Sequence, residues 1–505
     1  MPPGGSKSRP CGPNWKPFSA KTRPMARPFL PRNSLCVWLP FLGNKRPLEP
    51  LGKDRPIFHL LTPHHERSVT RMTNALLPRV RRGLALYAAR LRAFRPNARL
   101  YLLSVILTGA SMGVFRLLFN FYVVSLGYDK ALVGQLITTS SFAALVATLP
   151  MGYLADSLGR KPSLLIGTGT VSVAVLGMVL WPAPGTLYAM SALSGVAQSL
   201  LGVTMAPFLM ENSDEEERTY LFSFSSGLQM ASAFVGNWIG GYLPTWIAAW
   251  QGVAPTAALA YAGALVGVAL LSLTGLLPLL WIREQRLPHA ERSLFAPFAY
   301  AAKKPRLLTK LILPMLLTSI GAGLIMPFMN LFFREVHHQP DPVIGNLFAW
   351  GSLAMGVGLL IAPPIADRIG KIPLVVITQG LSIPFLVLLG FSPWFWVSAA
   401  AYFVRLALMN MSGPVYQTFV MEHVEASARA TVASLVSLSW NFGWAFSPMI
   451  SGWLQERYGF GPSFLGTITL YSLSVYLYWR FFWGEERPTS VPAPIEQPHP
   501  LSGAD

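Results

Sequence analysis

Two arginines, Arg116 and Arg405, each stand near the centre of a long apolar segment, where an ionisable side chain is costly and is a functional candidate. A guanidinium group is always charged, and its planar fork of N–H donors matches a carboxylate or phosphate through two parallel hydrogen bonds. No Asp, Glu or His stands in the interior of these apolar segments to neutralise them. The arginines therefore predict a site for an anionic group, although each could instead satisfy backbone carbonyls at a helix break or reach water.

Uncharged polar residues near the arginines could complete such a site. Asn120 follows Arg116 by one helical turn, and Asn410 lies close to Arg405 in the chain. The other two candidates, which lie in other apolar segments, are Gln198 and Asn330.

The composition indicates that lipid surrounds most of the chain. The 505 residues are 52% hydrophobic and 12% charged, with a mean hydropathy of +0.43, which argues against a water-soluble enzyme. A helix that crosses the hydrocarbon core needs about 20 mostly apolar residues. Twelve such runs are predicted near residues 102–125, 132–155, 163–182, 186–209, 220–243, 257–281, 308–332, 343–365, 373–391, 394–418, 430–453 and 462–480.

The net charge of +18 is concentrated at the N-terminus, because residues 1–100 hold 20 of the 40 Lys and Arg but only 3 of the 22 acids. Residues 1–98 are rich in Pro and Arg and contain no apolar stretch of spanning length, so we expect a disordered tail. An organelle transit peptide or a wrongly assigned start, with Met72 as the true first residue, are alternatives. The basic tail lacks periodic aromatics, so no nucleic-acid partner is expected.

The cysteines and histidines, which commonly bind metals, all lie outside the apolar segments. Both cysteines, Cys11 and Cys36, lie in the tail, and no metal-ligand spacing, phosphate-binding glycine loop or nucleophile elbow is found in the sequence. The sequence predicts neither a cofactor nor a metal, and no enzymatic activity.

The basic residues of the loops predict the orientation in the membrane. Fifteen lie on the side of the termini, whereas the opposite loops contain only Lys130, Arg334 and Arg457. Since positive charge is enriched on the cytoplasmic side, both termini and the loop near 282–307 are predicted to be cytoplasmic.

The chain repeats itself at an offset of 211 residues. Leu154-Ala155-Asp156 aligns with Ile365-Ala366-Asp367, and further blocks share this register without a gap. Two six-helix halves of the same orientation are therefore predicted, related by a pseudo-two-fold axis along the membrane normal. The expected organisation is a tail (1–98), a first half (99–281), a linker (282–307), a second half (308–483) and a disordered C-terminal tail (484–505).

The loop after the second apolar segment resembles the signature of the major facilitator superfamily. It contains Gly152, Asp156, Gly159, Arg160 and Lys161, although Ser157 stands where a basic residue is expected. The second copy keeps Asp367, Arg368, Gly370 and Lys371 but begins with Pro363. The fifth segment, with Gly236, Asn237, Gly240 and Gly241, is similar to an element of proton-linked antiporters, although Asn237 stands where Pro is expected. This similarity slightly favours export, whereas close packing of helices through small residues explains most of the pattern.

The signature loops predict a cytoplasmic latch. A carboxylate can accept hydrogen bonds from the free N–H groups at a helix N-terminus. We expect Asp156 to face the start of the eleventh helix near Arg429, and Asp367 to face the start of the fifth helix near Arg218, when the cytoplasmic side is shut. Simple solvation of these charges is the alternative.

The resemblance implies an all-α membrane protein in which helices one, four, seven and ten line a central cavity, with Arg116 and Arg405 at the depth of the substrate. It implies a multi-pass transporter of the cell membrane, secondary active or facilitative, that carries a small organic solute by alternating access and works as a monomer. The two arginines slightly favour an anionic or amphipathic solute, and the fifth segment slightly favours efflux. A membrane sensor or scaffold that keeps the fold without transport is the alternative.

Overall fold

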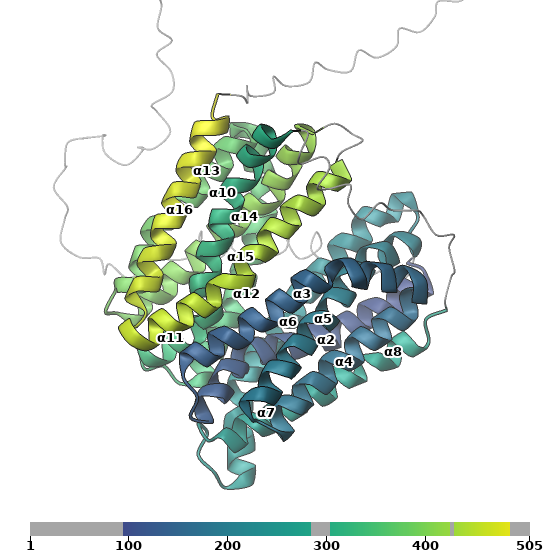
Figure 1. Ribbon diagram of the computed structural model, residues 1–505, viewed down its shortest axis with the longest axis vertical. Coiled ribbons are helices and arrows are strands. Elements are labelled where there is room, and N and C mark those ends of the chain that lie inside the picture. Colours follow the sequence, from purple (N-terminus) through teal and green to yellow (C-terminus); the bar gives the residue numbers. More distant parts are fainter. Residues whose placement is uncertain (1–93, 284–303, 425–428, 485–505) are drawn as a thin grey trace, which may run out of the picture. The chain divides into compact units, whose positions relative to one another are not determined.

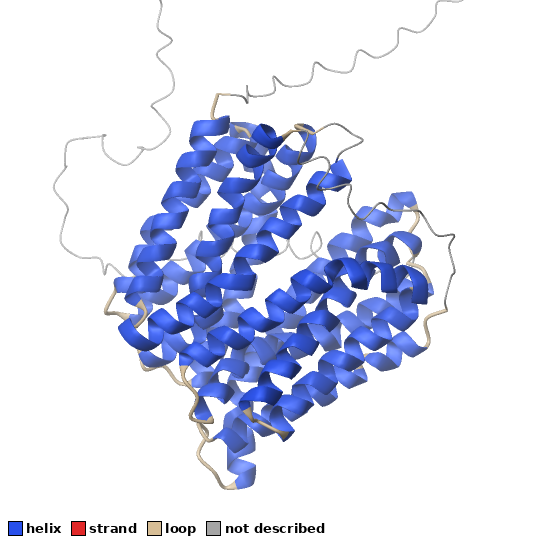
Figure 2. Ribbon diagram, viewed as in Figure 1, coloured by secondary structure: helices blue, strands red, loops and turns tan. Residues whose placement is uncertain are grey.

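The computed structural model describes residues 94–283, 304–424 and 429–484, which all belong to one compact unit. Within them every regular element is a helix (Figure 2). The elements are α2 (Pro96–Ser125), α3 (Lys130–Leu158), α4 (Arg160–Leu180), α5 (Pro184–Glu211), α6 (Glu215–Gln251), α7 (Ala258–Thr274), α8 (Leu276–Leu280), α10 (Pro305–Ile325), η1 (Met326–Phe328), α11 (Met329–Glu335), α12 (Asp341–Ile369), α13 (Lys371–Phe391), α14 (Phe395–Glu422), α15 (Arg429–Tyr458) and α16 (Gly461–Phe482).

These elements form the twelve predicted crossings, because α7 with α8 makes the sixth and α10, η1 and α11 make the seventh. Eight crossings are long and apolar enough to span a membrane by length and composition alone, and α6, α14, α15 and α16 are less apolar. Two of those four, α6 and α15, pack against the other half of the molecule. The largest difference from prediction is α6, which continues to Gln251 rather than ending near residue 243.

Parts of the predicted tails and linker lie outside the described residues, namely 1–93, 284–303 and 485–505. The predicted disorder of the tails and the alternative start at Met72 therefore stay predictions. We call the side where α2 begins and α16 ends the terminal face, and the other side the opposite face.

The helix boundaries confirm the repeat. Helices α3, α4 and α5 begin and end 211 residues before α12, α13 and α14, respectively. In Figure 1 the first half runs from purple to teal and the second from green to yellow. Gly159 and Gly370, one repeat apart, both have a φ of +94°, a conformation that residues with a Cβ rarely adopt. This turn lets the next helix start directly after the last.

Two seams join the halves, α3 with α15 and α6 with α12, and glycines one repeat apart allow both. A Cβ on Gly134 would meet the carbonyl oxygen of Pro448, and one on Gly345 would meet Gly241. The backbones thus touch, as in small-residue packing between membrane helices.

The closest contacts at the seams lie toward the opposite face. Along α3 and α15 they run from the Lys130 amide, which donates to Glu456 (3.1 Å), to the rings of Phe142 and Phe446 (5.7 Å). Along α6 and α12 they end at Phe234 and Trp350, whose rings are also 5.7 Å apart. The halves are therefore closed on the opposite face.

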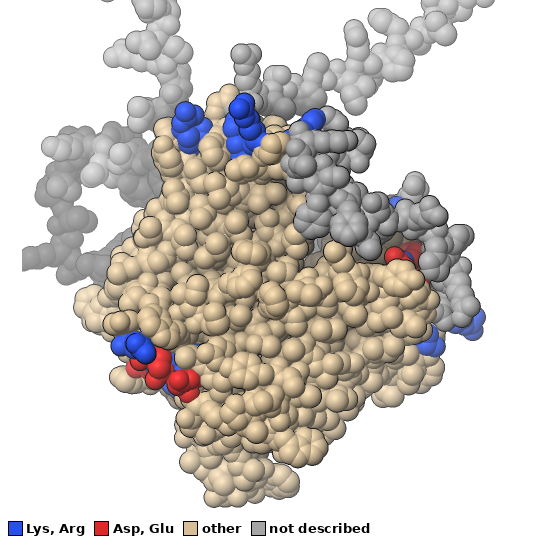
Figure 3. Space-filling view, viewed as in Figure 1, with Lys and Arg blue, Asp and Glu red and all other residues tan. Residues whose placement is uncertain are grey.

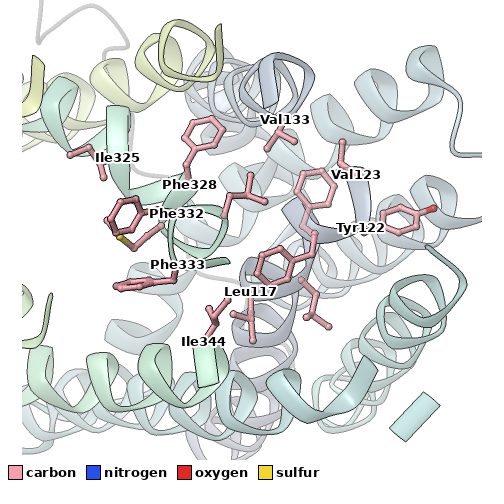
Figure 4. Packing of buried hydrophobic residues seen from close by; sticks show 14 of the residues in the cluster. Leu117, Tyr122, Val123, Val133, Ile325, Phe328, Phe332, Phe333 and Ile344 are labelled. Carbon is pink, nitrogen blue, oxygen red and sulfur yellow. The ribbon is translucent and has the colours of Figure 1, made fainter. Parts of the chain in front are cut away.

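The largest buried cluster also spans both halves. It includes Leu117 and Val133 of the first half with Phe328 of the second (Figure 4). Between lipid-immersed helices such packing stabilises through van der Waals contact rather than through exclusion of water. In Figure 3 the charged side chains lie near the edge of the visible face, at the top, the right and the lower left, and the broad area between them has none, as expected for a surface in contact with lipid.

On the terminal face of the first half, Asn97 ties three helices together. Its amide nitrogen donates to Asn212 Oδ1 (3.0 Å) and to the Arg283 carbonyl (2.9 Å), and its oxygen accepts from the Arg283 amide (3.0 Å). The side chain is 9% exposed, so truncation leaves buried partners unpaired. We expect Asn97→Ala to destabilise the protein by about 2 kcal/mol, seen as a lower midpoint of thermal denaturation in detergent. Asn410→Ala, which removes a bond within one helix, should have a smaller effect; equal losses would contradict the role of Asn97.

Candidate functional site

Arg116 lies on the face of α2 that is directed at the second half. Gly109 and Gly113 pack against α6, whereas Asn120, one turn beyond Arg116, reaches across to the second half. The Arg116 side chain is exposed, and among the described residues it has no hydrogen-bond or ion-pair partner. Because all the closest seam contacts lie toward the opposite face, this guanidinium stands on the terminal side of the closed interface, where a solute can reach it.

Arg405 of α14 is fully buried, with 0% exposure. Its guanidinium donates to Tyr471 Oη (3.3 Å), lies 3.9 Å from Met326 Sδ and is 5.5 Å from the centre of the Tyr471 ring. Its Nε has no hydrogen-bond partner, and no carboxylate pairs with it within the described parts of the chain. A buried charge without a counter-ion is unfavourable, so an anion would satisfy this group better than its present neighbours do.

Arg405 and Asn120, the residue one turn beyond Arg116, both contact the short segment η1. Met326, which Arg405 contacts, is the repeat counterpart of Arg116 at an offset of 210. The next residue, Pro327, accepts a hydrogen bond from Asn120. The break at η1 thus brings both arginines close to one level of the molecule.

Asn120 and Asn330 form a reciprocal contact that we call the amide clasp. Asn120 Nδ2 donates to Asn330 Oδ1 (2.9 Å) and to the Pro327 carbonyl (2.6 Å). Asn330 Nδ2 donates to the Leu117 carbonyl (2.8 Å), and Leu117 and Pro327 are themselves repeat counterparts. Both side chains are buried, at 3% and 1% exposure, so in this conformation the clasp occupies the amides that the sequence assigned to solute binding.

The remaining two solute candidates make bonds within their own helices. Gln198 Nε2 donates to Ser194 Oγ (3.1 Å), and Asn410 Nδ2 donates to the Leu406 carbonyl (2.8 Å). Both are partly exposed. These hydrogen bonds do not join Gln198 or Asn410 to either arginine, and the part of both residues in binding stays a prediction.

The signature loops form matching ion pairs within each half. Arg160 binds Glu211 through Nε (2.9 Å), and its repeat counterpart Lys371 binds Glu422. Arg160 also holds Asp156 at 2.7 Å. Each pair links the start of α4 or α13 to the end of α5 or α14, so these basic residues brace their own half.

In the second copy of the signature loop, the acid forms no such ion pair with the described residues. Asp367 and Arg368 are exposed, and Asp367 has no ion pair with any described residue. Arg218 of α6 has a buried Nε without a hydrogen-bond partner. The side chain of Arg429 lies outside what the structure describes, and Gly152 has open space around it. Since the seams close on the other face, the predicted latch is not tested by this conformation.

Sequence reasoning missed the polar contacts near the opposite face. Lys130 pairs with Glu335 (2.8 Å), and Arg334 pairs with Asp341 and contacts Tyr261. The sequence does contain a signal for these contacts: basic residues are rare in the loops of that side, and Lys130 and Arg334 are two of the three predicted there. Among the described residues, no group of His, Cys, Asp or Glu could hold a metal ion.

Comparisons with known proteins agree with this geometry. A family model described as Major Facilitator Superfamily matches residues 101–340 and 311–503. The chain belongs to this superfamily. It is a multi-pass membrane transporter rather than an enzyme, and its two six-helix halves are those of the family.

Relatives and solved structures extend the comparison. "Multidrug resistance protein MdtG" of Enterobacter lignolyticus (strain SCF1) is 25% identical over 387 residues, 74% of this chain and 89% of that protein. The MdtG protein of Serratia proteamaculans (strain 568) is 25% identical over 420 residues, covering 80% and 97%. The structure of nucleoside transporter NupG has a TM-score of 0.60 at 18% identity, covering 77% of this chain and 98% of that one. A bacterial homologue of the human lysosomal transporter Spinster, inward-facing and unoccupied, has a TM-score of 0.62 at 14% identity, covering 78% and 96%.

Proposed function

We propose that this transporter exports small organic solutes of anionic or amphipathic character by alternating access. The observation that carries this proposal is Arg116 on the face of α2 that is directed at the second half, an exposed guanidinium for which the described residues supply no partner. A solute carboxylate or phosphate would supply the missing acceptor. Arg405, which is buried and has no counter-ion within the described parts of the chain, is the second charge that such a solute would meet.

Export is supported by the relatives and by the seam of α6. The two relatives described above are multidrug resistance proteins. Gly241, the last residue of the antiporter-like element, packs on Gly345 of α12 and so contributes to closure of the opposite face. The exposed Arg116 guanidinium lies beside apolar helices. Such a site suits solutes that have a negative charge in common but differ in shape.

The charge of the solute could itself drive export. The excess of basic residues on the terminal face supports a cytoplasmic location for that face and both termini, in the cell membrane. A univalent anion that leaves a cell with a negative interior gains about 2.3 kcal/mol per 100 mV of membrane potential. Net export of an anion therefore needs no carboxylate in the membrane to carry a proton. One chain contains both halves of the pathway, so we expect a monomer to suffice.

The experiment that tests this function is transport in proteoliposomes with a set potassium diffusion potential. Organic anions, amphipathic anions and neutral solutes of similar size are compared. We expect anion flux that follows the potential and little flux of neutral solutes. Equal rates for anions and neutral solutes, or no flux of any solute from folded protein, would overturn the proposal.

The cytoplasmic latch belongs to the same cycle. In the present conformation Asp156 is already held by Arg160, whereas Asp367 and Arg218 both lack partners among the described residues. We infer that Asp367 and Arg218 meet when the cytoplasmic side closes, so that this arm of the latch favours the outward-facing state.

Removing this arm should slow transport. We expect Asp367→Asn to reduce the rate about fivefold, which corresponds to about 1 kcal/mol for one partly exposed ion pair. Exchanging the charges, with Asp367→Arg and Arg218→Asp in one protein, should restore part of the rate. Asp214→Asn is the control, since Asp214 pairs with Arg95 within the first half (2.5 Å). Rates of Asp367→Asn that match wild type would remove Asp367 from the latch.

A further inference from the structure

Three helices of the second half, α10, α15 and α16, meet around a group of buried oxygen atoms. Ser451 Oγ of α15 donates to the Leu324 carbonyl of α10 and lies 3.0 Å from Ser463 Oγ of α16. Gln455, one turn after Ser451, donates through Nε2 to Ser451 Oγ (2.7 Å) and to the Leu324 carbonyl (3.5 Å). The three side chains are at most 1% exposed. We call these four residues the oxygen cluster.

The side-chain amide of Gln455 is only half satisfied. Its Oε1 is buried and has no hydrogen-bond partner among the described residues. Because Oε1 is bonded to the same carbon as Nε2, it lies next to the groups that Nε2 contacts. A buried carbonyl oxygen without a donor is unfavourable, so this atom calls for a further positive or donating group beside the oxygen cluster.

The end of α10 adds main-chain oxygens of partial negative charge. The helix ends at Ile325, where the 3-10 turn η1 follows. Pro327 in this turn has no N–H and cannot donate to the Gly323 carbonyl four residues earlier. The Leu324 carbonyl is the one that α15 approaches with its side chains. The last carbonyls of a helix favour a cation, and in membrane transporters broken helices coordinate cations through them.

The polar side chains of α15 in this cluster are not a requirement of the repeated fold. At the offset of 211 residues, Ser451 corresponds to Gly240 and Gln455 to Pro244, both in α6. Neither of these residues has a polar side chain, and Gly240 packs against Val114. Polar groups buried at membrane depth are costly and indicate a function, so the second half has acquired them for a reason of its own.

We propose that the oxygen cluster binds one Na⁺ ion, through the Leu324 carbonyl, Ser451 Oγ, Ser463 Oγ and Gln455 Oε1. Hydroxyl and carbonyl oxygens replace the hydration shell of a monovalent cation. Among the described residues no carboxylate contacts these four groups, so the second charge of a divalent ion would stay uncompensated. Hydroxyl oxygens that already lie 3.0 Å apart suit Na⁺ better than the larger K⁺.

The cluster lies close to the opposite face, from which an ion can reach it. Gln455 precedes the end of α15 at Tyr458 by three residues, and Ser463 is the third residue of α16. A bound ion would hold the end of α10 directly before η1. Because η1 contacts Arg405 and Asn120, Na⁺ would stabilise the present arrangement of the segment that links the two halves.

The test measures Na⁺ binding to the full chain, purified in detergent without sodium and without solute. NaCl or KCl replaces choline chloride at constant ionic strength. We expect the midpoint of thermal denaturation to rise with Na⁺ and to saturate, whereas K⁺ should have no effect. Equilibrium dialysis with radioactive sodium should find about one ion per chain. No bound sodium in the folded protein, or equal stabilisation by K⁺, would overturn the proposal, and a buried water would then suffice for Gln455.

Removal of single ligands locates the ion. Ser463→Ala and Gln455→Leu should each weaken Na⁺ binding by about tenfold or more, since ligand number sets the affinity of such sites. Ser474→Ala is the matched control, because it removes another buried hydroxyl of α16, which contacts Thr318 Oγ1 (2.8 Å) and the Pro314 carbonyl (2.7 Å). This control should keep the wild-type affinity. Wild-type affinity in both ligand variants would place the ion elsewhere and overturn the site.

A gain of affinity separates ion binding from packing. Gln455→Glu keeps the shape of the side chain and adds a negative charge to the ligands, so at alkaline pH we expect Na⁺ to bind about tenfold more tightly. A purely structural role of Gln455 predicts no such gain, and its absence in the folded variant would overturn the proposal. Because binding is measured without solute, the result does not depend on whether the proposed solutes are carried.

Discussion

Arg116→Met should greatly reduce transport of anionic solutes and leave the protein folded. Methionine is the residue that the second half carries at the equivalent position, Met326, so the shared scaffold already accommodates it. Loss of a charge-assisted, two-bond contact is expected to lower anion transport by about hundredfold, since each such bond contributes about 1.5 kcal/mol or more.

The loss should be specific for charge. Arg116→Lys keeps the charge but not the planar fork, so we expect an intermediate rate with weaker apparent affinity. Neutral solutes that enter wild-type protein at any rate should pass through Arg116→Met at the same rate. Arg457→Met serves as the control for removing an arginine, because Arg457 stacks on Trp453 of its own helix (5.0 Å).

Two outcomes would contradict the role of Arg116. Unchanged anion transport in Arg116→Met would leave this guanidinium as a group that merely contacts water. Equal loss of anion and neutral transport would assign it a part in closing or opening the pathway instead. Both measurements come from the same proteoliposome assay, with thermal denaturation in detergent as the check on folding.

The sequence sufficed to predict the twelve helices and the repeat because both depend on local or periodic signals. Apolar runs of spanning length fix the helices, and the shared offset between Asp156 and Asp367 reveals the duplication. The helix boundaries of α3 and α12 then confirm the register residue by residue. These signals can be interpreted without knowing which helices are in contact.

The interface between the halves could not be predicted in the same way. Asn120 can bind either a solute or Asn330, depending on how far the halves have rotated. No local pattern in the sequence indicates that rotation. Asp341 was overlooked because it stands at the very start of a crossing, where an acid is unremarkable at a helix N-terminus. Only the fold shows that it is buried and that it orients Arg334 toward the first half.

Arg405→Met should keep or raise stability while removing anion transport. The side chain is fully buried, its Nε lacks a partner and no described carboxylate neutralises it. Replacing a buried, poorly compensated charge with an apolar residue of similar volume is commonly neutral or stabilising by about 1–3 kcal/mol. We therefore expect an equal or higher midpoint of thermal denaturation.

Stability and transport should change in opposite directions if Arg405 serves the solute. A residue that serves only packing would lower the denaturation midpoint by several degrees when replaced and leave the transport rate of the folded fraction unchanged. A residue retained for anion binding should give at least a tenfold loss of anion transport with no loss of stability. Anion transport by Arg405→Lys should fall between that of wild type and that of Arg405→Met, since an ammonium cannot form the bidentate contact.

The decisive measurement is stabilisation by solute. An anion that binds the native state raises the denaturation midpoint of wild-type protein in proportion to its occupancy. In Arg405→Met this shift should shrink or vanish, and in Arg457→Met it should persist. If the shift is unchanged in Arg405→Met, then Tyr471 and Met326 suffice to hold this guanidinium, and Arg116 alone remains to attract the negative charge of the solute.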